Sequence, residues 1–103
     1  MVNVFIYLKN TQNAKELVEL LLVEKLIASA TIDENNISYK MAQEKIIENV
    51  YSVITAQSKS LLLPEIIKVI EAKYGEDIPI NSSPIVGSNN AFLETILTKT
   101  IPT

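Results

Sequence analysis

The chain has 103 residues, with nine lysines against twelve acidic residues, a net charge of −3, and no histidine, cysteine or tryptophan. Arginine is also absent. This composition excludes histidine- or cysteine-based catalysis, tight thiolate or imidazole ligation of zinc and copper, and the bidentate arginine grip on phosphate. The lysines are spread singly along an acidic chain, which argues against nucleic-acid binding.

The N-terminal part of the chain predicts a strand followed by a helix. Residues 2–8 are a β-branched and aromatic run, typical of a strand that is buried on both faces. Asn10 and Thr11 then offer side-chain oxygens that suit a helix N-cap. Apolar residues recur at helical spacing from Ala14 onward, which predicts a helix that ends near Leu26.

Three extended segments follow. Residues 27–32 predict a strand, residues 33–36 a polar turn, and residues 37–41 a return to extended structure. Residues 46–57 are the longest predicted strand, and apolar residues fall on both of its faces. In so short a chain, we expect the second face of this strand to meet another subunit.

The second half of the chain predicts a helix, a short strand and a terminal helix. Ser60 suits an N-cap, Pro64 suits the first helical turn, and Gly75 stands where a left-handed residue ends a helix. Residues 83–86 predict a short strand, and the proline within it excludes a central place in a sheet. Residues 91–97 predict a short C-terminal helix.

The order β-α-β-β-α-β, with a helix appended, predicts the α+β class. With right-handed crossovers it gives a ferredoxin-like fold, an antiparallel sheet that carries both main helices on one face. We expect residues 1–103 to form one domain, since the length is near the commonest domain size. The first residues lack the features of a signal peptide, and no apolar run reaches the length of about 18 residues that spans a membrane. We therefore expect a cytoplasmic protein that does not enter the membrane.

Few residues are equipped for chemistry. Residues 9–11 either cap the following helix, which is the favoured interpretation, or offer backbone amides to an anion. The acidic pairs at 33–34 and 76–77 are solvated turn residues or weak ligands for a hard cation such as Mg²⁺. Two glycines, neither in a glycine-rich loop, exclude a phosphate-binding loop. Of the tyrosines, Tyr39 is the most open candidate for ligand contact, because most of the others fall on apolar stripes.

One segment resembles a known family. Residues 24–32, with the sequence E-K-L-I-A-S-A-T-I, resemble the E-K-L-A-A-C-A-T segment of the CutA divalent-cation-tolerance family. The further similarities are residues 39–45 in the place of Y-x-W-x-G-K, residues 74–80 in the place of H-P-Y-x-x-P-E, and Pro84 with Phe92-Leu93 in the place of the late L-P-V and Y-L-x-W-L stretch. The resemblance covers about residues 3–97.

The resemblance implies a ferredoxin-like fold that forms a tight trimer, with the long central hairpin contributing to sheets between subunits. It also implies a link to tolerance of divalent metals, copper above all, a similarity to PII signalling proteins, and no enzymatic reaction. The chain departs from the family at its metal ligands, since Ile6 stands near the family's cysteine, Tyr74 at its histidine and Ile80 at its glutamate. A soft-metal site does not carry over, and ligation by Met1 or Met41 would hold copper weakly.

These observations favour a CutA-like homotrimer linked to divalent-metal response, which is not an enzyme, lacks the Cys/His copper ligands and needs no cofactor. The alternative is a PII-like regulatory module that binds a small anionic ligand or a partner protein in clefts between subunits. We predict that Tyr39, Glu44 and Lys45 line such a cleft. We predict Glu76 and Asp77 as the ligands of any weakly held divalent cation.

Overall fold

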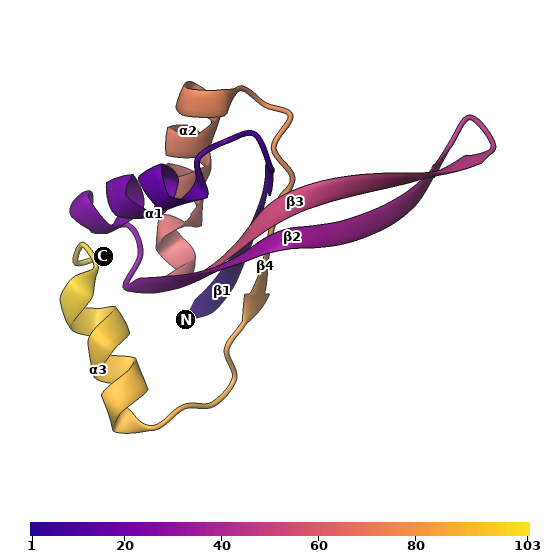
Figure 1. Cartoon of the computed structure of the whole chain (residues 1–103). Coiled ribbons are helices and arrows are strands. Elements are labelled where there is room, and N and C mark those ends of the chain that lie inside the picture. The colour runs from indigo at the N-terminus through magenta and orange to yellow at the C-terminus, as the bar shows by residue number, and fades with distance from the viewer.

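The computed structural model describes all residues from 1 to 103, which form one four-stranded sheet and three α-helices (Figure 1). The elements are β1 (Val2–Lys9), α1 (Ala14–Val23), β2 (Ser29–Ala42), β3 (Lys45–Ser58), α2 (Leu63–Tyr74), β4 (Ile80–Pro84) and α3 (Asn90–Lys99). The strand order is β2-β3-β1-β4, and every neighbouring pair is antiparallel. This order confirms the predicted ferredoxin-like arrangement with an added C-terminal helix.

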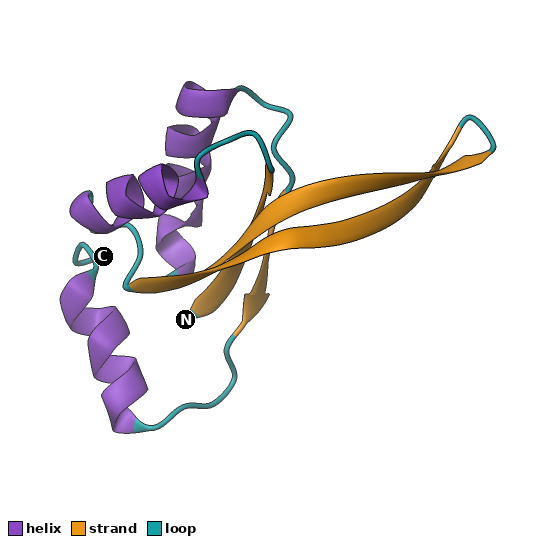
Figure 2. Cartoon of the chain, viewed as in Figure 1, coloured by secondary structure: helices purple, strands orange, loops and turns teal.

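The core lies between one face of the sheet and the helices α1 and α2, which sit together on that face (Figure 2). Alternate residues of β1 point toward the helices, as the period of two in a strand requires. The buried side chains of this cluster include Val2, Val4, Ile6 and Leu8 of β1, Leu17 and Leu21 of α1, and Ile66 and Ile70 of α2. Burying one such side chain contributes about 1.5–3 kcal/mol, so this layer fixes where each helix lies.

The hairpin of β2 and β3 is much longer than the strands beside it. Each of its strands has 14 residues, against 8 in β1 and 5 in β4. The register pairs β1 with β3 only from Ser58 back to Tyr51, so residues 45–50 of β3 have β2 as their one neighbour. The outer half of the hairpin therefore projects beyond the helices, and the molecule reaches 46 Å along its longest axis (Figure 1).

Two predictions about the first half of the chain are wrong in detail. Asn13, not Asn10 or Thr11, caps α1, because its side-chain oxygen accepts a hydrogen bond of 3.0 Å from the backbone N–H of Glu16. Residues 33–36 do not form a turn between two strands. They are an irregularity within the continuous strand β2, where the pairing with β3 shifts register.

The true turn of the hairpin is formed by Gln43 and Glu44. Both have positive φ, 50° and 63°. A two-residue hairpin loop with two positive φ values matches the twist of its strands, and glycine or asparagine normally occupies it. This chain places side chains there that resist the left-handed conformation, so the turn is strained.

The second half of the chain differs from the prediction at its boundaries. Ser60 begins a 3₁₀ turn that leads into α2 and does not cap the helix itself. Gly75 ends α2 with φ of 87°, as predicted. The short strand β4 ends at Pro84 rather than beginning near it, and it lies at the edge of the sheet, where a proline is tolerated.

The terminal helix α3 is attached mainly by its C-terminal end. Ile96 and Thr100 are buried, whereas Phe92 and Leu97 remain 37% and 53% exposed. Just after the helix, the backbone N–H of Ile101 donates a 2.9 Å hydrogen bond to the carbonyl of Lys25. None of the helices is both long and apolar enough to cross a membrane.

The strained turn gives a testable prediction. The double substitution Gln43→Asn with Glu44→Gly should raise the free energy of unfolding by about 1 kcal/mol, because these residues adopt positive φ readily. Urea denaturation at a fixed protein concentration measures the change. The control, Glu44→Ala, removes the same charge but keeps the β-carbon and should not stabilise the protein. Equal effects of the two variants would show that the turn is not strained.

Candidate functional site

A group of polar and aromatic side chains gathers on the sheet face that carries neither α1 nor α2. Tyr7 and Lys9 alternate with the buried residues of β1, so they point to this open face. The register places Tyr51 opposite Lys9, and places Ser38 of β2 opposite Asn49 of β3. We call these five residues the open-face cluster; they come from three strands at the point where β1 ends.

Two tyrosines and the serine of the open-face cluster line a cavity of about 270 Å³. Its lining residues are Tyr7, Ser38, Tyr51 and Pro79. The rings of Tyr7 and Tyr51 meet edge to face, with centroids 5.9 Å apart and an interplanar angle of 79°. The backbone N–H of Tyr7 donates a 3.1 Å hydrogen bond to the carbonyl of Pro79, which holds the proline beside the tyrosine pair.

Tyr51 also lines a second, more polar cavity of about 370 Å³. Its other walls are residues 9–11 of the loop after β1 and residues 48–50 of β3. The loop is tied into a turn, because the backbone N–H of Gln12 donates to the carbonyl of Lys9 at 2.9 Å and its side-chain oxygen accepts from the N–H of Lys9 at 2.9 Å. Since Asn13 caps α1, the side chains of Asn10 and Thr11 are left for the cavity.

Asn49 is the one residue with a buried side-chain polar atom that lacks a hydrogen-bond partner. Its amide nitrogen Nδ2 has no acceptor within the chain. Leaving a buried donor unsatisfied costs about 1–3 kcal/mol, and such groups are rare enough in folded proteins to need an explanation. Asn49 is also one of the residues that line the polar cavity.

The residues predicted to line a ligand cleft lie elsewhere, near the tip of the hairpin. Tyr39 is 61% exposed, and Glu44 and Lys45 are also exposed. The register pairs Tyr39 with Glu48, which places Tyr39 and Lys45 on opposite faces of the hairpin. Within one chain, therefore, the three residues do not form a common site, and their contribution to a cleft between subunits stays a prediction.

Tyr39 belongs instead to an exposed apolar stripe. Ile37, Tyr39 and Met41 of β2 share a face with Ile46 of β3, since Met41 and Ile46 are register partners. These four side chains, which we call the hairpin stripe, are between 54% and 72% exposed. They project beyond the helices, so no other part of this chain covers them (Figure 1).

The predicted cation ligands, Glu76 and Asp77, lie exposed in the turn after α2. No group of three or more histidine, cysteine, aspartate or glutamate residues comes together in the structure. At the positions where the resembled family has its cysteine and glutamate, Ile6 and Ile80 are register partners, and Ile6 is fully buried. Apolar side chains therefore occupy these two of the three positions, and the third holds Tyr74, whose hydroxyl donates a 3.5 Å hydrogen bond to the carbonyl of Asn13.

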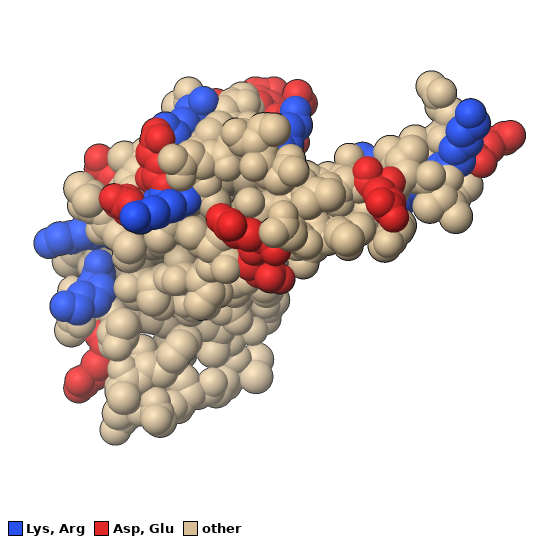
Figure 3. Space-filling view, in the orientation of Figure 1, with Lys and Arg blue, Asp and Glu red and all other residues tan.

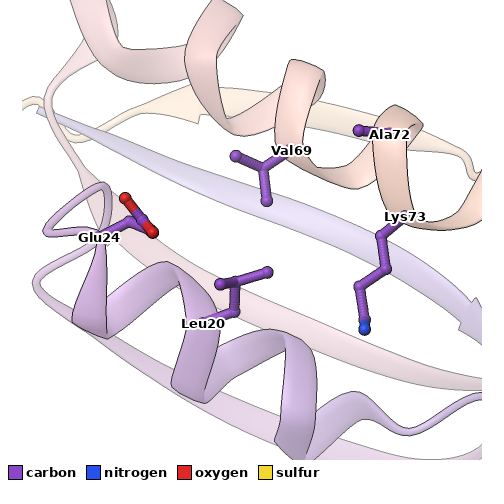
Figure 4. Close-up of a pocket in the computed structure, with 5 residues that line it drawn as sticks. All are labelled: Leu20, Glu24, Val69, Ala72 and Lys73. Atoms are coloured by element: carbon purple, nitrogen blue, oxygen red, sulfur yellow. The ribbon is translucent and has the colours of Figure 1, made fainter.

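A groove between α1 and α2 is the third concave feature, with a volume of about 360 Å³. Figure 4 shows Leu20 and Val69 pointing toward one another across it, with Glu24 at one end and Lys73 at the other. Its lining offers an apolar seam and two end charges of opposite sign. None of its side-chain polar atoms is both buried and without a hydrogen-bond partner, and we assign it to the packing of the helix pair.

The Lys73 end of this groove is an ion pair that joins the two helices. The ammonium of Lys73 donates a hydrogen bond to a carboxylate oxygen of Glu16. This bond raises the pKa of Lys73 above its ordinary value of 10.5, against the opposing effect of burial. Elsewhere the charges are dispersed: Figure 3 shows lysines and acidic residues interspersed over the helices and the hairpin tip, with no continuous basic face on the side shown.

Comparison with known proteins places the fold. The sequence matches no protein-family model and no curated protein. Among solved structures, it superimposes on CutA1 from Oryza sativa with a TM-score of 0.88 and 21% identity, covering 99% of this chain and 94% of that one. It superimposes on CutA1 from Pyrococcus horikoshii with a TM-score of 0.86 and 21% identity, covering 99% of this chain and 100% of that one.

A third match extends the comparison. The structure named periplasmic divalent cation tolerance protein CutA, from Archaeoglobus fulgidus, gives a TM-score of 0.84 and 22% identity, covering 96% of this chain and 98% of that one. The chain thus has the fold of the CutA proteins over essentially its whole length. The resemblance read from the sequence is confirmed at the level of the fold.

The Lys73–Glu16 pair predicts a pH dependence. Because the pKa of Lys73 is raised in the folded state, its contribution to stability is fully present below pH 10.5 and is lost as the pH rises through the raised pKa. Glu16→Gln should therefore lower the melting temperature at neutral pH, and the difference from the wild type should narrow at strongly alkaline pH. Glu19→Gln, which breaks the exposed 4.0 Å pair with Lys15, is the control and should have a smaller effect. If Glu16→Gln lowered the melting temperature by the same amount at neutral and at strongly alkaline pH, the ion pair with Lys73 would not be the cause.

Proposed function

We propose that this chain is a CutA-like protein that assembles as a homotrimer and takes part in the response to divalent metal ions, without catalysing a reaction. The observation that carries the proposal is the shared fold, which extends over 96–99% of the chain in structures named CutA or CutA1. The segment at residues 24–32, which resembles the family's E-K-L-A-A-C-A-T, supports it from the sequence. The proposal includes a cytoplasmic location, with which the absence of cysteine is compatible.

The hairpin stripe supports assembly. Large apolar side chains on a projecting hairpin leave a contiguous surface that water solvates poorly, and such surfaces mark sites of association. Met41 and Ile46, at 64% and 72% exposure, lie near the tip, where only another molecule can cover them. In the trimer we propose, each hairpin lies along a neighbouring subunit, so that the stripe becomes part of a common core.

Assembly is tested by breaking the stripe. The variant Met41→Lys with Ile46→Lys places two like charges opposite one another on the apolar face and should shift the mass from trimer to monomer. Multi-angle light scattering on the purified protein measures the mass. Val23→Lys is the control, since Val23 is 77% exposed on α1, away from the hairpin, and this variant should stay trimeric. A monomeric wild type at micromolar concentration would refute the proposal.

Any part that this protein plays in the response to divalent metals must work without histidine or cysteine ligands. Carboxylates of Glu76 and Asp77 suit hard cations such as Mg²⁺, but two exposed groups give little affinity, with a dissociation constant of about 1 mM or weaker. For copper, the chain offers only carboxylates, backbone groups and methionines, which bind Cu²⁺ poorly compared with imidazole and thiolate. We therefore propose a part in metal response that does not depend on tight copper binding, and no cofactor.

Calorimetric titration of tag-free protein with Cu²⁺, Zn²⁺ and Mg²⁺ tests this part of the proposal. We expect no tight binding of Cu²⁺ or Zn²⁺ and at most weak Mg²⁺ binding. Any Mg²⁺ signal should disappear in Glu76→Gln with Asp77→Asn and persist in the control Asp33→Asn with Glu34→Gln. Copper binding at micromolar concentration would contradict the expected absence of a soft-metal site.

A second candidate function, a PII-like module for a small anionic ligand, is favoured by one observation. The two cavities beside Tyr51 place a lysine and an unpartnered amide close to a pair of aromatic rings. That combination suits a ligand better than it suits a purely structural surface.

A further inference from the structure

We propose that α3 of one subunit covers the hairpin stripe of the next, so that the subunits dock head to tail. The inference rests on the proposed homotrimer and names the surface that each hairpin meets. The stripe lies near the tip of the hairpin, whereas α3 lies beside the opposite end of the sheet (Figure 1). In a molecule 46 Å long, these two surfaces do not meet within one chain.

The hairpin stripe continues the sheet face that α1 and α2 cover. Ile32 and Ile54 are register partners, and Ile54 is fully buried in the core together with residues of both helices. Since side chains two residues apart on a strand share a face, Ile46 and its register partner Met41 lie on the same side of the hairpin as Ile54. The inner part of this apolar face is therefore covered by helices, and the outer part has no helix.

The helix α3 carries more apolar surface than its own chain covers. Phe92 and Ile96 form one row along it, and Leu93 and Leu97 form the neighbouring row, because residues four apart lie on one side of a helix. Of these four side chains only Ile96 is buried, and Phe92 and Leu97 are 37% and 53% exposed. Val86, in the segment that leads to α3, is 97% exposed. An apolar side of a helix normally faces a packed surface, and α3 lacks most of that surface here.

The two surfaces therefore match in kind. Helices of this fold pack their apolar side on one face of the sheet, as α1 and α2 do. The stripe is the outward extension of that face without a helix, and α3 is a helix whose apolar rows lack a sheet. Because the two partners contribute different surfaces, the contact is heterologous. Repetition of a heterologous contact closes into a ring when the rotation allows it, and a trimer is such a ring.

The absence of cysteine permits a direct cross-linking test. Met41→Cys with Leu97→Cys in one chain places one thiol on each surface, at positions that are 64% and 53% exposed. A short bismaleimide should join these chains into covalent trimers on a denaturing gel, and each single variant should keep the mass of one chain. Met41→Cys with Val23→Cys is the matched control. Val23 is 77% exposed on α1, so this variant should give no covalent trimer.

A second pair of variants tests whether the contact holds the assembly together. Phe92→Lys with Leu97→Lys places two charges on the apolar rows of α3, and covering them with the stripe is unfavourable. Light scattering should therefore show a shift from trimer to monomer. Thr95→Lys with Thr98→Lys adds the same charge to exposed positions on the other side of α3 and should stay trimeric.

The outcomes distinguish this inference from the trimer on which it rests. A monomeric wild type would refute both. A trimeric protein whose paired thiols at positions 41 and 97 do not cross-link, or which stays assembled as Phe92→Lys with Leu97→Lys, would overturn the docking of α3 and leave the trimer intact. Covalent dimers formed by Met41→Cys alone would also overturn it, because they would show that the hairpins meet one another instead.

Discussion

The unequal lengths of the strands constrain everything else in this molecule. The sheet is antiparallel, and β1 ends at Lys9, which pairs with Tyr51 of β3. Beyond that pair, β3 extends for six residues, as far as Lys45. The two core helices cover only the part of the sheet that β1 supports. Beyond it, an isolated two-stranded ribbon is at best marginally stable in water, and here it also carries exposed apolar side chains. The fold is therefore compact at one end and incomplete at the other.

The end of β1 is where both kinds of candidate surface begin. The loop after Lys9 turns away from the sheet toward α1, and the space it leaves beside β3 becomes the polar cavity. On the open face at the same level, the tyrosine pair, Ser38 and Pro79 line the second cavity. Farther out, the hairpin stripe begins at Ile37. The same shortening of one strand thus produces a concave region suited to a small ligand and a projecting surface suited to another subunit.

Hydrophobic periodicity was enough to predict the order of elements and the fold, because each buried face repeats with the period of its element. Local polar chemistry was less informative. Four polar residues at 33–36 resembled a turn, yet pairing with β3 on both sides keeps them in one strand, with the left-handed Asn35 absorbing the shift. The open-face cluster was not predicted, since register rather than sequence spacing joins Lys9 to Tyr51. The sequence predicts that Tyr39 and Lys45 line one cleft between subunits, but strand alternation places them on opposite faces of the hairpin.

The most direct test of the central claim, that other copies of the chain cover the outer hairpin, is hydrogen exchange of the amides in residues 36–50. At protein concentrations at which the assembly persists, these amides should be as protected as those of β1, and protection should fall on dilution below the dissociation range. Rapid exchange of the hairpin at every concentration, beside a protected β1, would show that the ribbon is free in solution. That result would contradict the assembly on which the CutA-like proposal depends.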